Sequence, residues 1–167
     1  MKRLAAFLLC LALAGTANAQ RERLDELQSA AQDYNLDLEW QPAQLRLVLS
    51  ALAAGNRGAA PALEGDIPGA VVRLDTRDYQ DRRARIYITL PTQTRGLDAG
   101  TDLELFWQSS GEVIEGSVRP GQSALLYEGR VEKPVTLFTL NLRLVVGDSI
   151  RSRQFVLEPF YEIELLP

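Results

Sequence analysis

Residues 138–146 read FTLNLRLVV and form the longest alternating pattern in the chain. Apolar residues occupy every second position, and Thr139, Asn141 and Arg143 lie between them. Because successive side chains of a β-strand point to opposite faces, this alternation predicts a strand with one face in a hydrophobic core and the other toward solvent. A Gly-Asp pair at 147–148 predicts the end of the strand.

Shorter alternating runs follow one another from residue 70 onward. They predict strands around positions 72–74, 86–90, 103–107, 113–114, 125–127, 155–157 and 161–165, with turns at 109–111 and 120–121. About eight short strands separated by turn residues are typical of a sandwich or small barrel. We therefore predict a mainly β protein with an antiparallel β-sandwich over residues 70–167. In its number of strands the segment resembles immunoglobulin-like domains, and this implies the same general architecture.

Two short α-helices are predicted ahead of the sandwich. Residues 21–35 repeat apolar residues at three- and four-residue spacing, and residues 42–54 start with a proline and stop at a Gly-Asn pair. Leucines also alternate in the second segment, which is the pattern of a strand, but its length favours a helix. A short strand is predicted between them at 36–40. The helices would cap the core or, alternatively, mediate assembly with a partner.

The chain divides into four parts on this basis. Residues 1–19 have the basic start, short apolar run and Ala-Asn-Ala site of a signal peptide. Residues 20–55 form the helical segment, 56–69 a linker rich in Gly, Pro and Ala, and 70–167 the sandwich. The apolar run is shorter than the roughly 20 residues that span a bilayer. We therefore expect cleavage before Gln20, export to a bacterial periplasm or, alternatively, secretion, and no integral membrane segment afterwards.

The composition excludes several kinds of chemistry. The chain has no histidine, and its one cysteine and one methionine are Cys10 and Met1, both within the leader. Ser-His-Asp and Cys-His catalysis, disulfides, and zinc, copper or haem sites are thereby disfavoured. Without Lys2 and Arg3 the mature chain has 16 basic and 22 acidic residues, a net charge of −6, which argues against nucleic acid as a partner. We predict no cofactor, no metal and no enzymatic activity.

Two sets of residues are candidates for a binding surface. Tyr87, Phe106 and Phe160 lie at the polar positions of their predicted strands, so they form an exposed aromatic patch unless the helices cover them. The second set is an arginine-rich segment that would recognise anions or, alternatively, compensate its own Asp75, Asp78 and Asp81. Its members are Arg73, Arg77, Arg82, Arg83 and Arg85.

The sequence thus predicts an exported, non-catalytic module that binds a protein of the envelope or a secreted protein, with open sheet edges as a further recognition device. One alternative is a glycan-binding module or a small glycan hydrolase, which requires Glu104 to lie near Glu162 or Glu164. A second alternative is an enzyme inhibitor or immunity-type protein with a protruding loop at 78–85. A weak calcium site at 98–102 is the remaining possibility for a ligand.

Overall fold

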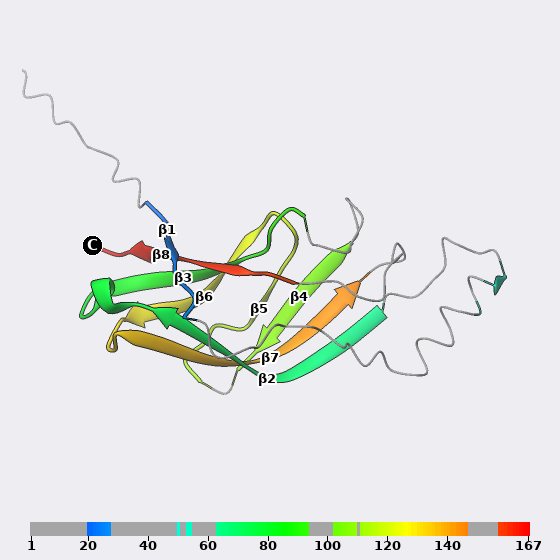
Figure 1. Ribbon diagram of the computed structural model, residues 1–167, viewed down its shortest axis with the longest axis horizontal. Helices are drawn as coiled ribbons and strands as arrows, with labels where there is room; N and C mark the ends of the chain where they lie inside the picture. Colours follow the sequence, from blue (N-terminus) through cyan, green and yellow to red (C-terminus); the bar gives the residue numbers. More distant parts are fainter. Residues whose placement is uncertain are drawn as a thin grey trace, which may run out of the picture.

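The computed structural model describes residues 20–27, 50, 53–54, 63–93, 102–109, 111–146 and 157–167. This part of the chain is mainly β, with eight strands and one short 3-10 helix. The strands form two four-stranded antiparallel sheets that pack face to face around one core (Figure 1). The predicted antiparallel sandwich is confirmed, while the finer likeness to immunoglobulin domains stays a prediction.

The two sheets, here called sheet A and sheet B, interleave strands from the whole chain. Sheet A has the order β1 (Glu22–Leu24), β8 (Phe160–Leu165), β3 (Arg83–Thr89) and β6 (Ser123–Arg130). Sheet B has the order β2 (Leu63–Asp75), β7 (Val135–Val146), β4 (Leu103–Gln108) and β5 (Gly116–Val118). The 3-10 helix η1 (Arg77–Tyr79) connects β2 to β3.

Residues 138–146, the longest alternating pattern in the sequence, lie inside β7, and β7 lies between β2 and β4 (Figure 1). Its predicted inward residues are all buried, and they are Phe138, Leu140, Leu142, Leu144 and Val146. Burying a large apolar side chain contributes about 1.5–3 kcal/mol, so this strand supplies a large part of the core. Trp107 of β4 is also buried, and its indole Nε1 donates to the carbonyl oxygen of Ile114 at 2.7 Å.

The predicted linker is wrong over residues 63–69, because β2 begins at Leu63. Pro68 and Gly69 lie in a bulge, where the register with β7 shifts between Ile67 and Ala70. A bulge accommodates a proline that cannot donate to the ladder and a glycine at a φ of 67°. The amide of Gly69 donates to Oδ1 of Asn141 at 3.0 Å, so the bulge is tied to β7. Residues 56–62 lie outside the described residues.

The first predicted helix is wrong over residues 21–27. Residues 22–24 form β1 on the edge of sheet A, and Glu26 then bridges to Leu74 of β2. Leu24 is buried in the core, and this pairing outweighs the weak helical preference of the segment. Residues 28–35, like the strand predicted at 36–40, lie outside the described residues.

Neither predicted helix is supported. Of the second one, at 42–54, only Ser50, Ala53 and Ala54 are described, and the amide of Ala54 donates to the carbonyl of Ser50 at 3.0 Å. Ser50 and Ala53 have helical backbone, and the rest of this predicted helix lies outside the described residues. Two predicted strands also differ from the structure. Residues 113–114 precede β5 and are not in a strand. Of the strand predicted at 155–157 only Leu157 is described, and it is buried but not in a strand.

Two short segments close the sides of the sandwich by bonding to both sheets. On one side β1 pairs with β8, and the amide of Leu27 then donates to the carbonyl of Arg73 in β2 at 2.9 Å. On the other side the amide of Ile114 donates to the carbonyl of Leu126 in β6 at 2.8 Å, and β5 then pairs with β4. Covering edge strands in this way limits unwanted strand pairing.

We predict that Gly129→Ala lowers the free energy of unfolding by about 1–3 kcal/mol, because the new methyl group would overlap the buried ring and hydroxyl of Tyr127. The Tyr127 hydroxyl is held in place by donating to the carbonyl of Arg130 at 2.9 Å. Urea unfolding at pH 7 measures the change. Gly111→Ala is the control, since its nearest neighbouring atom lies 3.7 Å away. Equal midpoints for the two variants would contradict the predicted overlap.

Candidate binding surfaces

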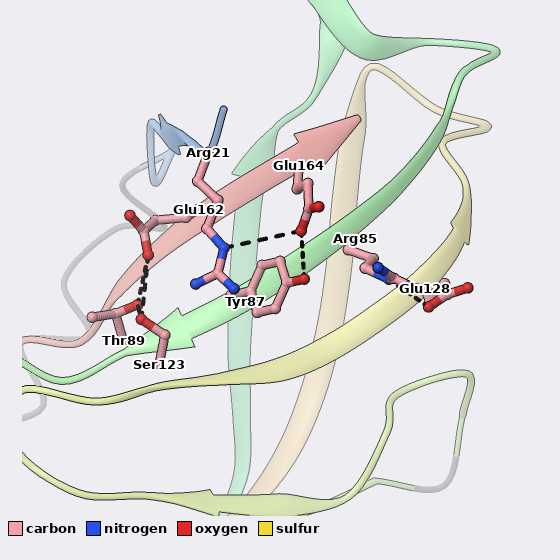
Figure 2. A network of polar contacts seen from close by, with 8 residues as sticks. All are labelled: Arg21, Arg85, Tyr87, Thr89, Ser123, Glu128, Glu162 and Glu164. Atoms are coloured by element: carbon pink, nitrogen blue, oxygen red, sulfur yellow. Dashed lines mark hydrogen bonds and ion pairs between the residues drawn. The ribbon is translucent and has the colours of Figure 1, made fainter. Parts of the chain in front are cut away.

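The outer face of sheet A carries Tyr87, one of the predicted binding residues, and the chain's own N-terminal segment covers it (Figure 2). The Tyr87 hydroxyl donates to Oε2 of Glu164 at 2.5 Å, and the Arg21 guanidinium lies 3.7 Å from the centre of the Tyr87 ring. Nε of Arg21 is also 4.0 Å from Oε2 of Glu164. Burial, followed by the bond to Glu164, raises the pKa of Tyr87.

Phe160, the second predicted aromatic, is covered in the same way. The guanidinium of Arg23 lies 4.6 Å from the centre of the Phe160 ring. Arg21 and Arg23 are two residues apart, so both point to one face of the extended segment. A cation–π contact contributes about 0.5–1 kcal/mol at an exposed site and more when desolvated. Arg21 and Arg23 therefore cover the aromatic residues Tyr87 and Phe160 of sheet A.

The remaining polar side chains on this face also pair with one another (Figure 2). Thr89 donates its hydroxyl to Oε2 of Glu162 at 2.9 Å and shares a 2.7 Å hydrogen bond with the hydroxyl of Ser123. Nε of Arg85 donates to Oε2 of Glu128 at 2.7 Å, and this hydrogen bond and the charge of Glu128 raise the pKa of Arg85. The face is thus a self-paired network across β8, β3 and β6.

The arginine-rich segment is divided between the two sheets. Arg73 lies in β2 of sheet B, Arg83 and Arg85 lie in β3 of sheet A, and Arg77 and Arg82 lie in the turn between them. Arg77 pairs with Asp75 at 3.0 Å, as the self-compensating alternative predicts. Whether any of these arginines contacts a partner stays a prediction.

The protruding loop predicted at 78–85 is not present. Residues 77–79 form η1, and β3 already begins at Arg83. The amide of Asp81 donates to the carbonyl of Val131 at 2.8 Å, and the Asp81 carboxylate lies 3.2 Å from Nη2 of Arg130. The segment is a tight turn held against the start of the β6–β7 connection.

Phe106 and Glu104 lie on the outer face of sheet B, whereas Tyr87 and Phe160 lie on sheet A. Oε1 of Glu104 accepts from the hydroxyl of Ser117 at 2.7 Å and Oε2 from Nη2 of Arg119 at 2.8 Å, and these two donors lower the pKa of Glu104. The predicted proximity of Glu104 to Glu162 or Glu164 is wrong, because those residues belong to sheet A. A general acid also needs a raised pKa, so this carboxylate is not suited to that role.

The predicted calcium segment at 98–102 lies outside the described residues except for Asp102. In the described ranges, no three or more Asp, Glu, His or Cys side chains gather in a way that could hold a metal ion. The described part of the chain contains no helix that is long and apolar enough to cross a membrane.

The sequence predicted open sheet edges as a recognition device but not which strand provides one. β4 ends at Gln108, which pairs with Asn141, but β7 continues back to Val135. Residues 135–140 therefore pair with β2 on one side and, within the described residues, with no strand on the other. The segment reads VTLFTL and carries no charge, which is the signal that could have identified it.

A slot of about 380 Å³, called here the β7 slot, lies beside this open edge. Tyr127 and Phe138 line it, with ring centres 5.8 Å apart, and Val113 lines it from the segment before β5. Leu137, which also lines the slot, has 60% of its surface exposed and is one of two large hydrophobic residues so exposed in the described chain. The β7 slot thus combines free backbone groups with a lining that is partly apolar and partly polar.

Comparison with known proteins adds little to this geometry. No protein-family model matches the chain, and no curated protein matches it in sequence. Among solved structures, the crystal structure of the P pilus rod subunit PapA is similar over 87% of this chain and 100% of that chain, at 11% identity and a TM-score of 0.42. A similarity at this level carries no argument about function.

We predict that Tyr87→Phe lowers the free energy of unfolding by about 1 kcal/mol, because it removes the hydrogen bond to Glu164. The amide of Leu24 in β1 should also exchange faster, since the Tyr87–Glu164–Arg21 contacts hold the N-terminal segment on sheet A. Urea unfolding and hydrogen exchange measure the two effects. Phe106→Leu on sheet B is the control and should leave exchange at Leu24 unchanged. Exchange at Leu24 that is no faster in Tyr87→Phe than in wild type would contradict the proposed role of Tyr87 in holding the N-terminal segment.

The lowered pKa of Glu104 gives a pH-dependent prediction. A carboxyl group whose pKa is lower in the folded state stabilises the fold above its unfolded value of 4.5, and this stabilisation is lost as the pH falls through the folded value. Glu104→Gln should therefore be less stable than wild type at pH 7, and the difference should shrink by pH 3. Urea unfolding at both pH values tests it, with exposed Glu158→Gln as the control. A difference that is constant with pH would contradict the assignment.

Proposed function

We propose that this protein is an exported, non-catalytic binding or assembly module of the bacterial envelope, and that it recognises a protein partner by pairing with one of the partner's strands. The observation that carries the proposal is the β7 slot, in which an uncharged strand edge lies open beside a partly apolar cavity. An incoming strand would extend sheet B where β4 has ended.

The backbone of β7 supports this mode of binding. In an antiparallel sheet, alternate residues of a strand direct both their N–H and C=O groups to the same side. Within residues 135–140, every second residue therefore offers a donor and an acceptor to the open side. These groups would be satisfied by a partner's strand, and their hydrogen bonds would give affinity with little dependence on sequence.

The other sheet edges are less suited to accept a strand. β1 and β5 are each three residues long, and β2 has a bulge and Pro68 in its middle. β6 is longer, but it has an irregular register with β3, carries Glu128 and Arg130, and already accepts a hydrogen bond from the amide of Ile114. Bulges, prolines and short lengths are the devices that protect edges from pairing. The β7 edge has none of them in residues 135–140.

The lining of the slot favours a partner strand with apolar residues at alternate positions. Such side chains would enter the cavity beside Tyr127 and Phe138, while Leu137 would form an apolar rim. Central apolar contacts of this kind carry most of the energy in many interfaces. The charged residues of the lining would contribute to orientation more than to affinity, and they are Glu112, Arg130, Glu132 and Lys133.

Export and the absence of catalysis are part of the same proposal. The leader at 1–19 supports export, and the mature chain without histidine or cysteine supports a binding role over an enzymatic one. The partner would be another envelope or secreted protein. In this proposal Tyr87 and Phe160 hold the N-terminal segment, and they do not contact the partner.

We predict that Leu137→Lys weakens partner binding at least about tenfold, because it places a charge on the apolar rim of the slot. The partner is first captured from an envelope extract with the mature protein, and its affinity for each variant is then measured. Ile114→Lys is the matched control, since Ile114 is the other large exposed hydrophobic residue and does not line the slot.

Hydrogen exchange of the complex provides the second readout. Binding by strand addition should protect amides within residues 135–140, whose outward groups have no strand partner in the described chain. A partner that binds Leu137→Lys as well as wild type, or that protects only amides elsewhere, would overturn the proposal.

A further inference from the structure

The outer face of sheet B carries a second concave surface, which is separate from the β7 slot. It is a groove of about 740 Å³, called here the Phe106 groove. Phe106 of β4 and Val145 of β7 line it, while Pro68 in the β2 bulge and Gly116 at the start of β5 lie at its two sides. The groove therefore crosses all four strands of sheet B.

Negative charge predominates in the groove. Its lining includes the carboxylates of Glu64, Asp66 and Glu115 and one cation, the guanidinium of Arg143. Nε of Arg143 donates to Oδ1 of Asp66 at 2.9 Å, so these two charges compensate each other. Glu64 and Glu115 are in no ion pair with any described residue, and they leave the groove with a net charge of about −2.

The lining also contains an aromatic ring in a position to contact a ligand. Phe106 is half-buried and lies in register between Ser117 of β5 and Arg143 of β7. Aromatic faces attract cations, and arginine above all. The same chain provides two examples on the other sheet, where Arg21 stacks on Tyr87 and Arg23 on Phe160. In the described chain, no cationic side chain is stacked on Phe106.

We propose that the Phe106 groove binds an extended segment of a partner protein that alternates arginine with apolar residues. The arginine side chains would contact the carboxylates of Glu64 and Glu115, and one of them would stack on Phe106. The groove's volume holds several side chains at once, and its negative charge repels anionic ligands. This site shares no residue with the β7 slot, so it stands independently of the strand-addition proposal.

The test uses the mature protein and two labelled ten-residue peptides. The probe alternates arginine with valine, and its counterpart has glutamate in place of arginine. The basic peptide should bind, with an affinity that falls as salt is added, and the acidic peptide should not. Fluorescence anisotropy measures both affinities.

Two double variants separate site binding from general charge attraction. Glu64→Gln/Glu115→Gln should weaken binding of the basic peptide at least about tenfold. Glu128→Gln/Glu158→Gln makes the same change in net charge outside the groove, and it should bind within about twofold of wild type. Phe106→Leu should weaken binding about threefold or more, because the cation–π contact is lost. Thermal unfolding of each variant confirms that it is folded.

The outcomes decide between the proposals. Equal binding of the basic peptide by the two double variants overturns the proposal. So does a dissociation constant for the basic peptide weaker than about 1 mM. Binding that is unchanged in Phe106→Leu does the same. Leu137→Lys should leave peptide binding intact, so a loss in that variant would place the peptide in the β7 slot and would also overturn it. Loss of glycan binding by a groove variant, measured on a glycan array, would assign the groove to carbohydrate ligands and would also overturn the proposal.

Discussion

Burial of one face of β7 is the interaction on which the rest of the structure depends. Its five inward side chains contact the core beneath sheet A, and its two neighbours, β2 and β4, are aligned by its register. A strand that must bury alternate residues cannot slip by one position without turning its apolar set to solvent. The length of β7 therefore decides where sheet B has a paired edge and where it has an open one.

The parts of the fold that the sequence predicted are those in which periodicity and burial agree. The alternation at 138–146, 103–107 and 161–165 corresponds to β7, β4 and β8, because each strand buries one face. The N-terminal segment was misread because three of its residues pair with a strand at the far end of the chain. Local spacing carries no information about such a distant partner. The start of β2 was missed because Gly65, Pro68 and Gly69 resemble a linker, although a bulge accommodates them.

The candidate binding residues show the limit of the same reasoning. Period-two alternation placed Tyr87, Phe106 and Phe160 on outer faces, and they do lie there. It could not show that two of them lie on one sheet and one on the other, or that arginines of the chain itself would cover the pair. The β7 slot depends on the difference in length between two paired strands, which no single segment reveals. The sequence alone therefore shows which residues form strands but not which strands pair with one another.

The pairing of β1 with β8 joins residues close to the two ends of the described chain. Contacts between such distant residues close a very long loop, and the entropy of that closure makes them slow to form. Sheet A can therefore gain β1 as its outermost strand only after β8 has been synthesised. The order of folding is thereby constrained: the hairpin of β4 and β5, which are consecutive in the chain and pair with each other, is available early, and β1 pairs with β8 last.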